Sequence, residues 1–149
     1  MASPVDGVAA CVLASASPQR RAILGDLGVS FLVRPTDVDE LAEGAPADVA
    51  IENARRKARA AAAAALSPAT LVIGCDTVVA ADERLWGKPH DRDAARTTLT
   101  ALAGRRHEVV SGLCLIRGDV ERVASERTGV WFRELGERAI ERYLDAGEW

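Results

Sequence analysis

The sequence predicts an α/β protein with a mixed sheet, because short apolar runs alternate with helical segments and a hairpin follows them. Residues 71–81 carry the strongest strand signal, and residues 108–116 and 120–132 are predicted to form two strands joined at Gly118-Asp119. The 149-residue chain has the length of one domain, and 48% of its residues are hydrophobic. We therefore expect one core and a single domain over residues 1–149.

The first third of the chain is predicted to form a strand, a helix, a short strand and a loop. Residues 8–14 are apolar, as in a buried strand. Ser17-Pro18 then opens a helix that runs to about Leu27, because Ser is a favoured N-cap and Pro is favoured at the first helical position. Residues 31–34 are predicted to form a short strand, and the acidic residues 35–46 a loop.

Three further helices are predicted. A long helix over residues 47–66 includes six consecutive alanines and ends at Ser67-Pro68. Asp91 is expected to cap a helix that continues to about Ala103, and residues 135–146 have the pattern of an amphipathic helix.

Charge and cysteine content narrow the classes of function. The net charge of −3 does not favour a general nucleic-acid binder, which usually carries a basic face. The apolar stretch near the N-terminus is too short to span a membrane and follows no basic residue, so we expect a cytoplasmic protein without a membrane partner. Cys11, Cys75 and Cys114 lie in apolar runs and are expected to be reduced thiols.

The segment from Ser15 to Arg21 is a candidate phosphate site. It places a helix N-terminus after a buried strand, and such an end offers free backbone N–H groups to an anion. Arg20 and Arg21 are unfavourable beside the positive end of a helix dipole unless an anion lies between them. The alternative is an ordinary capped helix whose arginines are solvated.

Asp76 interrupts the most apolar strand of the chain. A carboxylate in that setting needs a partner, because an unpaired buried charge costs several kcal/mol. A cation or a lysine would supply one, and the alternative is a strand-end aspartate bonded to a neighbouring backbone N–H. Lys88 is fixed between Gly87 and Pro89, whereas Lys57 belongs to a cluster of basic residues on the long helix that could simply be solvated.

The remaining polar candidates are weaker. Asp37, Asp39 and Glu40 form an acidic loop that either serves solubility or supplies oxygen ligands to a metal. His107 is interpreted as structural. The two histidines of the chain have no zinc-site spacing and no hydrolase triad pattern.

Taken together, these segments resemble the Maf family of nucleoside triphosphate pyrophosphatases. The resemblance runs through nearly the whole chain, and its specificity lies in the order and spacing of the motifs. The matching segments are residues 13–21, 38–40, 54–58, 73–79, 87–89 and 102–109.

The resemblance implies an elongated mixed sheet flanked by helices, with two lobes and a central cleft. It implies hydrolysis of a nucleoside triphosphate to the monophosphate and diphosphate with a divalent metal cation such as Mg²⁺, Mn²⁺ or Co²⁺. Family members act on pyrimidine or modified triphosphates, are associated with nucleotide-pool housecleaning and arrest of cell division, and commonly form homodimers. Their chains continue for several tens of residues past the position of Trp149, so the domain is expected to be incomplete at its C-terminus.

Carried over residue by residue, the resemblance makes Asp76 the catalytic carboxylate and a metal ligand, with Glu40 as a second metal ligand. The phosphate-contacting positions are Ser15, Arg20, Lys57 and Lys88. Two positions bear on base preference and disagree. Thr77 is similar to the pyrimidine-selective branch, whereas Gln19 stands where that branch usually has Arg.

The sequence also allows a function other than catalysis. The chain could be a non-catalytic, nucleotide-binding regulator of septum formation and cell division. The two differ in whether a bound triphosphate is turned over.

Overall fold

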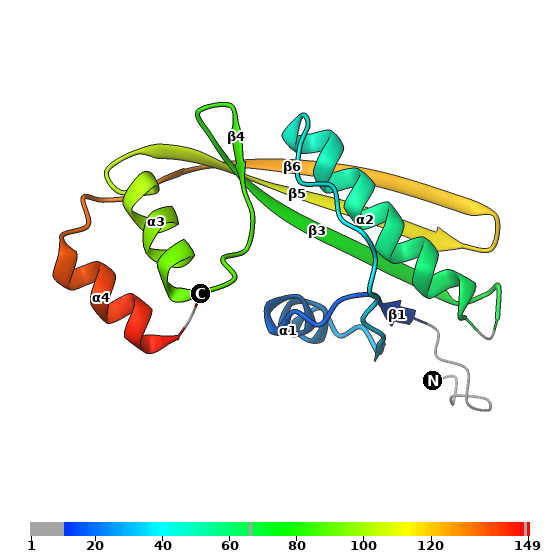
Figure 1. The fold of residues 1–149 in the computed structure, drawn as a ribbon. Coiled ribbons are helices and arrows are strands. Elements are labelled where there is room, and N and C mark those ends of the chain that lie inside the picture. Colours follow the sequence, from blue (N-terminus) through cyan, green and yellow to red (C-terminus); the bar gives the residue numbers. More distant parts are fainter. Residues whose placement is uncertain (1–10, 66, 148) are drawn as a thin grey trace.

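The computed structural model describes residues 11–65, 67–147 and 149, which form a six-stranded sheet and four helices (Figure 1). In chain order the elements are β1 (Cys11–Leu13), α1 (Pro18–Asp26), β2 (Leu32–Val33), α2 (Pro46–Ala63), β3 (Leu71–Ala81), β4 (Arg84–Trp86), α3 (Arg92–Leu102), β5 (Arg106–Arg117), β6 (Val120–Trp131) and α4 (Glu137–Ala146).

The sheet is mixed, as the sequence predicts. Its strand order is β2-β1-β3-β5-β6, with β4 paired to the end of β3. β1 is parallel to β2 and β3, whereas β5 is antiparallel to both of its neighbours, β3 and β6. The long β3, β5 and β6 strands give the sheet its elongated shape (Figure 1).

Capping and turn chemistry explain most element boundaries. The Ser17 side chain accepts a hydrogen bond from the Arg20 backbone N–H at the start of α1, and Asp91 does the same for Ala94 at the start of α3. Asp82 and Glu83 both have positive φ, 50° and 59°, which is the backbone of a tight two-residue hairpin turn between β3 and β4.

Some predicted boundaries differ from those observed. The predicted strand over residues 31–34 is reduced to β2, and α4 begins two residues later than predicted, at Glu137. The first strand is observed only over Cys11–Leu13, since residues 8–10 of the prediction lie outside the described residues. α2 ends at Ala63, and residue 66 of the predicted helix is also outside them.

Small residues let α2 lie directly against the sheet. α2 buries Ala50, Ala54 and Ala58 on the face that contacts β3 and β5. A Cβ atom on Gly74 of β3 would overlap the Ala54 carbonyl, and one on Gly112 of β5 would overlap the backbone of Ala50. The helix therefore approaches the two strands more closely than larger side chains would permit.

The two ends of the long strands carry different helices, which divides the molecule into two lobes (Figure 1). α2 covers one face of the sheet, and the opposite face holds a cluster in which Leu24 of α1 packs against buried Cys11 and Leu13. At the far end, α3 and α4 pack on each other through Ala95, Ile140 and Leu144. None of the described helices is long and apolar enough to cross a bilayer.

Candidate functional site

Asp76 lies in the middle of β3 on the face that α2 covers, and it is only 6% exposed. Its Oδ1 atom accepts a hydrogen bond of 2.7 Å from Lys57 Nζ, and its Oδ2 atom accepts one of 3.0 Å from Asn53 Nδ2. Both donors come from α2, four residues apart, so they lie on one side of the helix. The predicted need for a partner is met by a lysine and an amide rather than by a backbone N–H.

Lys57 connects two carboxylates. Its Nζ atom lies 2.7 Å from Asp76 and 2.8 Å from Glu40 Oε1, and only 13% of its side chain is exposed. The ammonium group has three N–H donors, so it can bind both oxygens at once. Lys57, for which the sequence also allowed a solvated position on the helix, is therefore the positive charge that joins Asp76 and Glu40.

Asn53 was not singled out from the sequence, yet it connects the acidic loop to Asp76 of β3. The residue is 1% exposed, and its amide binds both backbone groups of Leu41, with 2.7 Å to the N–H and 3.1 Å to the carbonyl. The same Nδ2 atom donates to Asp76. Its position four residues before Lys57, among the alanines of the buried helix face, is the signal that could have identified it.

These residues line one side of a cavity of about 440 Å³. Lys88 and Trp86 line it from the segment at and after β4, and Thr77 and Val78 from β3. Volumes of this order are typical of small-molecule sites. Among the residues that the structure describes, the lining comprises Glu40, Leu41, Ala42, Asn53, Lys57, Asp76, Thr77, Val78, Leu85, Trp86, Gly87 and Lys88.

Arg20 forms a second polar cluster beside the cavity. Its guanidinium donates to Ser15 Oγ at 2.9 Å, to the Cys75 carbonyl at 3.2 Å and to Thr77 Oγ1 at 3.1 Å. Thr77 thus contacts Arg20 and also lines the cavity. Gln19 is exposed, and its side-chain oxygen accepts a hydrogen bond from Ser17 Oγ at 3.0 Å.

The structure brings five of the predicted residues to one cavity: Glu40, Lys57, Asp76, Thr77 and Lys88. Ser15 and Arg20 join them indirectly, through the contact between Arg20 and Thr77. Gln19 is not among the lining residues. His107, interpreted as structural, is 4% exposed and packs edge-to-face on Phe132, with ring centroids 4.6 Å apart.

The acidic residues fit a metal carried by a substrate better than a metal held by protein alone. Among the residues that the structure describes, no cluster contains three or more His, Cys, Asp or Glu side chains able to hold a cation. Asp76 and Glu40 nevertheless converge on one nitrogen, so they lie close enough to share one cation. Mg²⁺ is often bound by one or two carboxylates together with substrate phosphates, and this pair meets that requirement.

The three cysteines are free thiols, as predicted. Burial raises the pKa of Cys11 and Cys75, and it raises the pKa of Cys114 to about 11. For Cys75 the neighbouring Arg20 and Lys57 partly oppose the effect of burial. A raised pKa keeps a thiol protonated at neutral pH, so none of the three is a candidate nucleophile.

Comparison with known proteins shows which family the chain belongs to. The sequence matches the family model described as Maf-like protein over residues 10–149. The chain belongs to this family. It is 42% identical over 139 residues to the dTTP/UTP pyrophosphatase of Symbiobacterium thermophilum, covering 92% of this chain and 71% of the relative. It is 45% identical over 152 residues to the dTTP/UTP pyrophosphatase of Novosphingobium aromaticivorans, covering 99% of this chain and 75% of the relative.

Solved structures of low identity share the fold of this Maf-like chain. A HAM1 protein from Coxiella burnetii superposes with a TM-score of 0.56 at 17% identity, over 80% of this chain and 70% of that protein. A dITP/XTP pyrophosphatase from Mycobacterium abscessus gives a TM-score of 0.54 at 19% identity, over 80% and 72%. These likenesses confirm the predicted α/β architecture.

Proposed function

We propose that this chain is a nucleoside triphosphate pyrophosphatase of nucleotide-pool housecleaning that acts in the cytoplasm on pyrimidine triphosphates of the dTTP/UTP type. The observation that carries the proposal is the buried Asp76 carboxylate, held by Lys57 and Asn53 at the wall of a cavity that Lys88 also lines. The names of the two relatives, both dTTP/UTP pyrophosphatases, support the substrate class.

The reaction adds water across the bond between the α- and β-phosphates and releases the monophosphate and diphosphate. A triphosphate carries about four negative charges near neutral pH, so its binding requires a concentration of positive charge. Lys88 is exposed at the cavity and free to bind phosphate oxygens. Lys57 is fixed between two carboxylates, where it can offset negative charge that develops on the transferred phosphoryl group.

Asp76 is proposed as the group that accepts the proton of the attacking water. Each of its oxygens receives one hydrogen bond, and each retains a lone pair that can accept another. The two fixed donors hold the carboxylate in one orientation, which general-base catalysis requires. When bound, a divalent cation held by Asp76 and Glu40 would supply positive charge and polarise the phosphoryl oxygens.

Base preference is proposed to depend on Thr77 more than on Gln19. Thr77 lines the cavity, and its hydroxyl is oriented by hydrogen bonds with Arg20 and Ser111, at 3.1 and 3.3 Å. Gln19 is exposed and bonded to Ser17, outside the lining of the cavity. Of the two positions, only Thr77 lines the cavity, and Thr77 is the one that favours a pyrimidine base.

The test is diphosphate release from dTTP and UTP in the presence of Mg²⁺ or Mn²⁺. Asp76→Asn keeps the shape of the side chain but removes the proton acceptor, so we expect the rate to fall by roughly 10²–10⁴-fold. The matched control is Asp119→Asn, the same change at an exposed position outside the cavity, which should leave the rate within about twofold of the wild type.

Two results would contradict the proposal. Equal diphosphate release by wild type and Asp76→Asn would remove Asp76 from the mechanism. Triphosphate binding detected by calorimetry, without turnover of any canonical or modified triphosphate, would favour the regulator of septum formation.

A further inference from the structure

Two hydroxyl side chains, Thr77 of β3 and Ser111 of β5, lie directly opposite each other in the sheet. Ala14 donates its backbone N–H to the Ile73 carbonyl, so the backbone groups of Ile73 face β1, away from β5. Those of Thr77, four residues on, face the same way, because the side alternates with each residue of a strand. Thr77 and Ser111 therefore form a non-hydrogen-bonded pair, in which the side chains of two strands are closest. The register thus fixes the contact between their hydroxyls, which is 3.3 Å long.

Arg20 limits how the Thr77 hydroxyl can be used. A guanidinium group has only N–H donors and is always positively charged. Arg20 donates to Thr77 Oγ1 at 3.1 Å, so this oxygen accepts the bond and its single proton points elsewhere. In the pair formed with Ser111 Oγ, either hydroxyl can donate. The direction of that one hydrogen bond decides whether Thr77 presents a donor or an acceptor to a ligand.

The charge of Arg20 favours one of the two directions. A ligand atom bonded to Thr77 Oγ1 also lies near the guanidinium group. The positive charge attracts an acceptor such as a carbonyl oxygen, and it repels the hydrogens of an amino group. When a carbonyl accepts the Thr77 proton, the second lone pair of Oγ1 accepts from Ser111. A hydroxyl that accepts two hydrogen bonds is polarised by them and donates more strongly.

We propose that Ser111 is a positioning residue which, together with Arg20, makes Thr77 a donor to an exocyclic carbonyl oxygen of the base. The inference rests on the proposed function, since it concerns how the same cavity selects its nucleotide. Thr77 lines that cavity and follows Asp76 directly in β3. Uracil and thymine carry a carbonyl oxygen at C4, where cytosine carries an amino group. The site therefore selects UTP and dTTP over CTP.

Glu126 of β6 is the group that could reverse this direction. It lies opposite Ser111 in the neighbouring ladder, and its carboxylate could accept the Ser111 proton. Thr77 would then donate to Ser111 and present only an acceptor to the ligand. Within the described part of the chain, however, no hydrogen bond joins Ser111 to Glu126. The Ser111 proton is therefore available to Thr77.

Steady-state kinetics with UTP and CTP measure the selection. We expect the wild type to prefer UTP. Thr77→Val keeps the shape of the side chain but loses the hydroxyl, so kcat/KM for UTP should fall by roughly 10–10²-fold with little change for CTP. Ser111→Ala should lower kcat/KM for UTP by about fivefold, mainly through a higher KM, because base binding is remote from the reacting phosphorus. Ser111→Thr keeps a hydroxyl and should retain the preference for UTP.

A double variant tests whether Ser111 acts through Thr77. If it does, Thr77→Val combined with Ser111→Ala should lose no more activity on UTP than Thr77→Val alone, because the second change removes a partner of a hydroxyl that is already absent. Losses that multiply would show that the two residues act separately, and the positioning role would be wrong.

Two variants on β6 serve as controls. Ser125→Ala is the same change as Ser111→Ala at another exposed position, and it should leave the ratio of kcat/KM for UTP and CTP within about twofold of the wild type. Glu126→Gln should also leave this ratio unchanged. If Glu126→Gln alters the ratio as much as Ser111→Ala does, the Ser111 proton points to Glu126 and the proposed direction is wrong.

Calorimetry on Asp76→Asn separates this inference from the proposed function. Binding of UTP and CTP to that variant is measured without turnover, and Ser111→Ala in the same background should weaken UTP binding by about fivefold. A wild type that releases no diphosphate contradicts the proposed function alone. Equal affinities for UTP and CTP, or a preference that Ser111→Ala leaves unchanged, overturn the role of Ser111 alone. If neither nucleotide binds, both proposals fail.

Discussion

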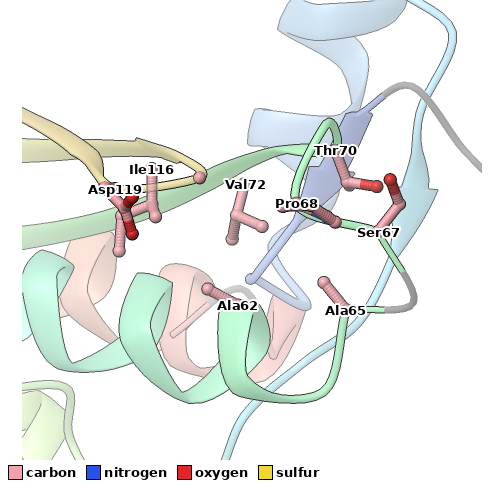
Figure 2. A pocket seen from close by; sticks show the side chains of 9 residues that line it. Ala62, Ala65, Ser67, Pro68, Thr70, Val72, Ile116 and Asp119 are labelled. Atoms are coloured by element: carbon pink, nitrogen blue, oxygen red, sulfur yellow. The ribbon is translucent and has the colours of Figure 1, made fainter.

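Two cavities at different positions along α2 differ more in chemistry than in size. The cavity beside Asp76 has a volume of about 440 Å³, and a second one, near the C-terminal end of the helix, has about 320 Å³ (Figure 2). The second is lined mainly by small or apolar side chains such as Ala62, Ala65 and Ile116, and Asp119 is the charged side chain among its described lining residues. The first gathers two carboxylates, two lysines and a buried amide.

The comparison shows that convergent charge, and not volume, distinguishes the candidate site. The Asp76 carboxylate can be buried because Lys57 and Asn53 each donate a hydrogen bond to it. An unpartnered carboxylate in the same strand would cost several kcal/mol. Burying these charged groups therefore costs folding free energy, which is typical of a functional site. The small residues around the second cavity, by contrast, are explained by packing alone.

Among changes to the residues around Asp76, the largest effect is expected from removing the Lys57 ammonium group, which Asp76 and Glu40 share. Lys57→Met keeps much of the side-chain volume but leaves Asp76 and Glu40 without their common partner, so diphosphate release should fall by about 10²–10³-fold. The free energy of unfolding should also fall, by roughly 3–5 kcal/mol, because a buried charge loses its partner. Steady-state kinetics and urea unfolding measure the two effects.

Arg59→Met is the matched control for that substitution. It removes a basic side chain from the same helix, but from an exposed position that contacts Glu121 rather than the cavity. Its activity should stay within about twofold of the wild type, since surface changes of this kind have small effects. If both variants lose activity equally, general loss of positive charge explains the effect and the specific role of Lys57 is wrong.

A smaller effect is expected from Asn53→Ala, which releases the acidic loop from β3. The change leaves both backbone groups of Leu41 unpaired and removes one donor to Asp76. We expect kcat/KM to fall by about tenfold and the free energy of unfolding by roughly 1–3 kcal/mol.

The assay for Asn53 should run well below the melting temperature of both proteins, so that the folded fractions are equal. If the loop positions Glu40 for a metal, the concentration of Mg²⁺ needed for half-maximal rate should rise together with the loss of kcat. Lower thermal stability with unchanged kinetics would reduce Asn53 to a structural role.

Local patterns predicted most of the fold, and contacts between distant segments supplied the rest. The capping residues Ser17 and Asp91, and the strand over Leu71–Ala81, are confirmed because each depends on neighbouring residues. β2 is shorter than its apolar run suggests, since its ladder with β1 spans two residue pairs. Strand ends are set by the partner strand, which the run itself does not encode.

The candidate site divides in the same way. Asp76 could be identified because a carboxylate in an apolar strand is a local anomaly. The sequence around Lys57 fitted a solvated basic helix face equally well. Asn53 stood in no local pattern that distinguished it. Their roles depend on the close approach of α2 to β3, which Gly74 permits from a position far along the chain. Close approach between segments distant in sequence is not visible in periodicity or spacing.

The smallest effect is expected from a substitution at the second cavity. It tests directly whether activity depends only on the cavity beside Asp76. Ala65→Leu adds apolar volume to a cavity that Ala65 already lines, without touching Asp76 or its partners. Diphosphate release should stay within about twofold of the wild type, because the cavity contributes no charge to the reaction. A loss comparable to that of Asn53→Ala would mean that the two ends of α2 are coupled, and the chemical distinction between the cavities would then no longer locate the function.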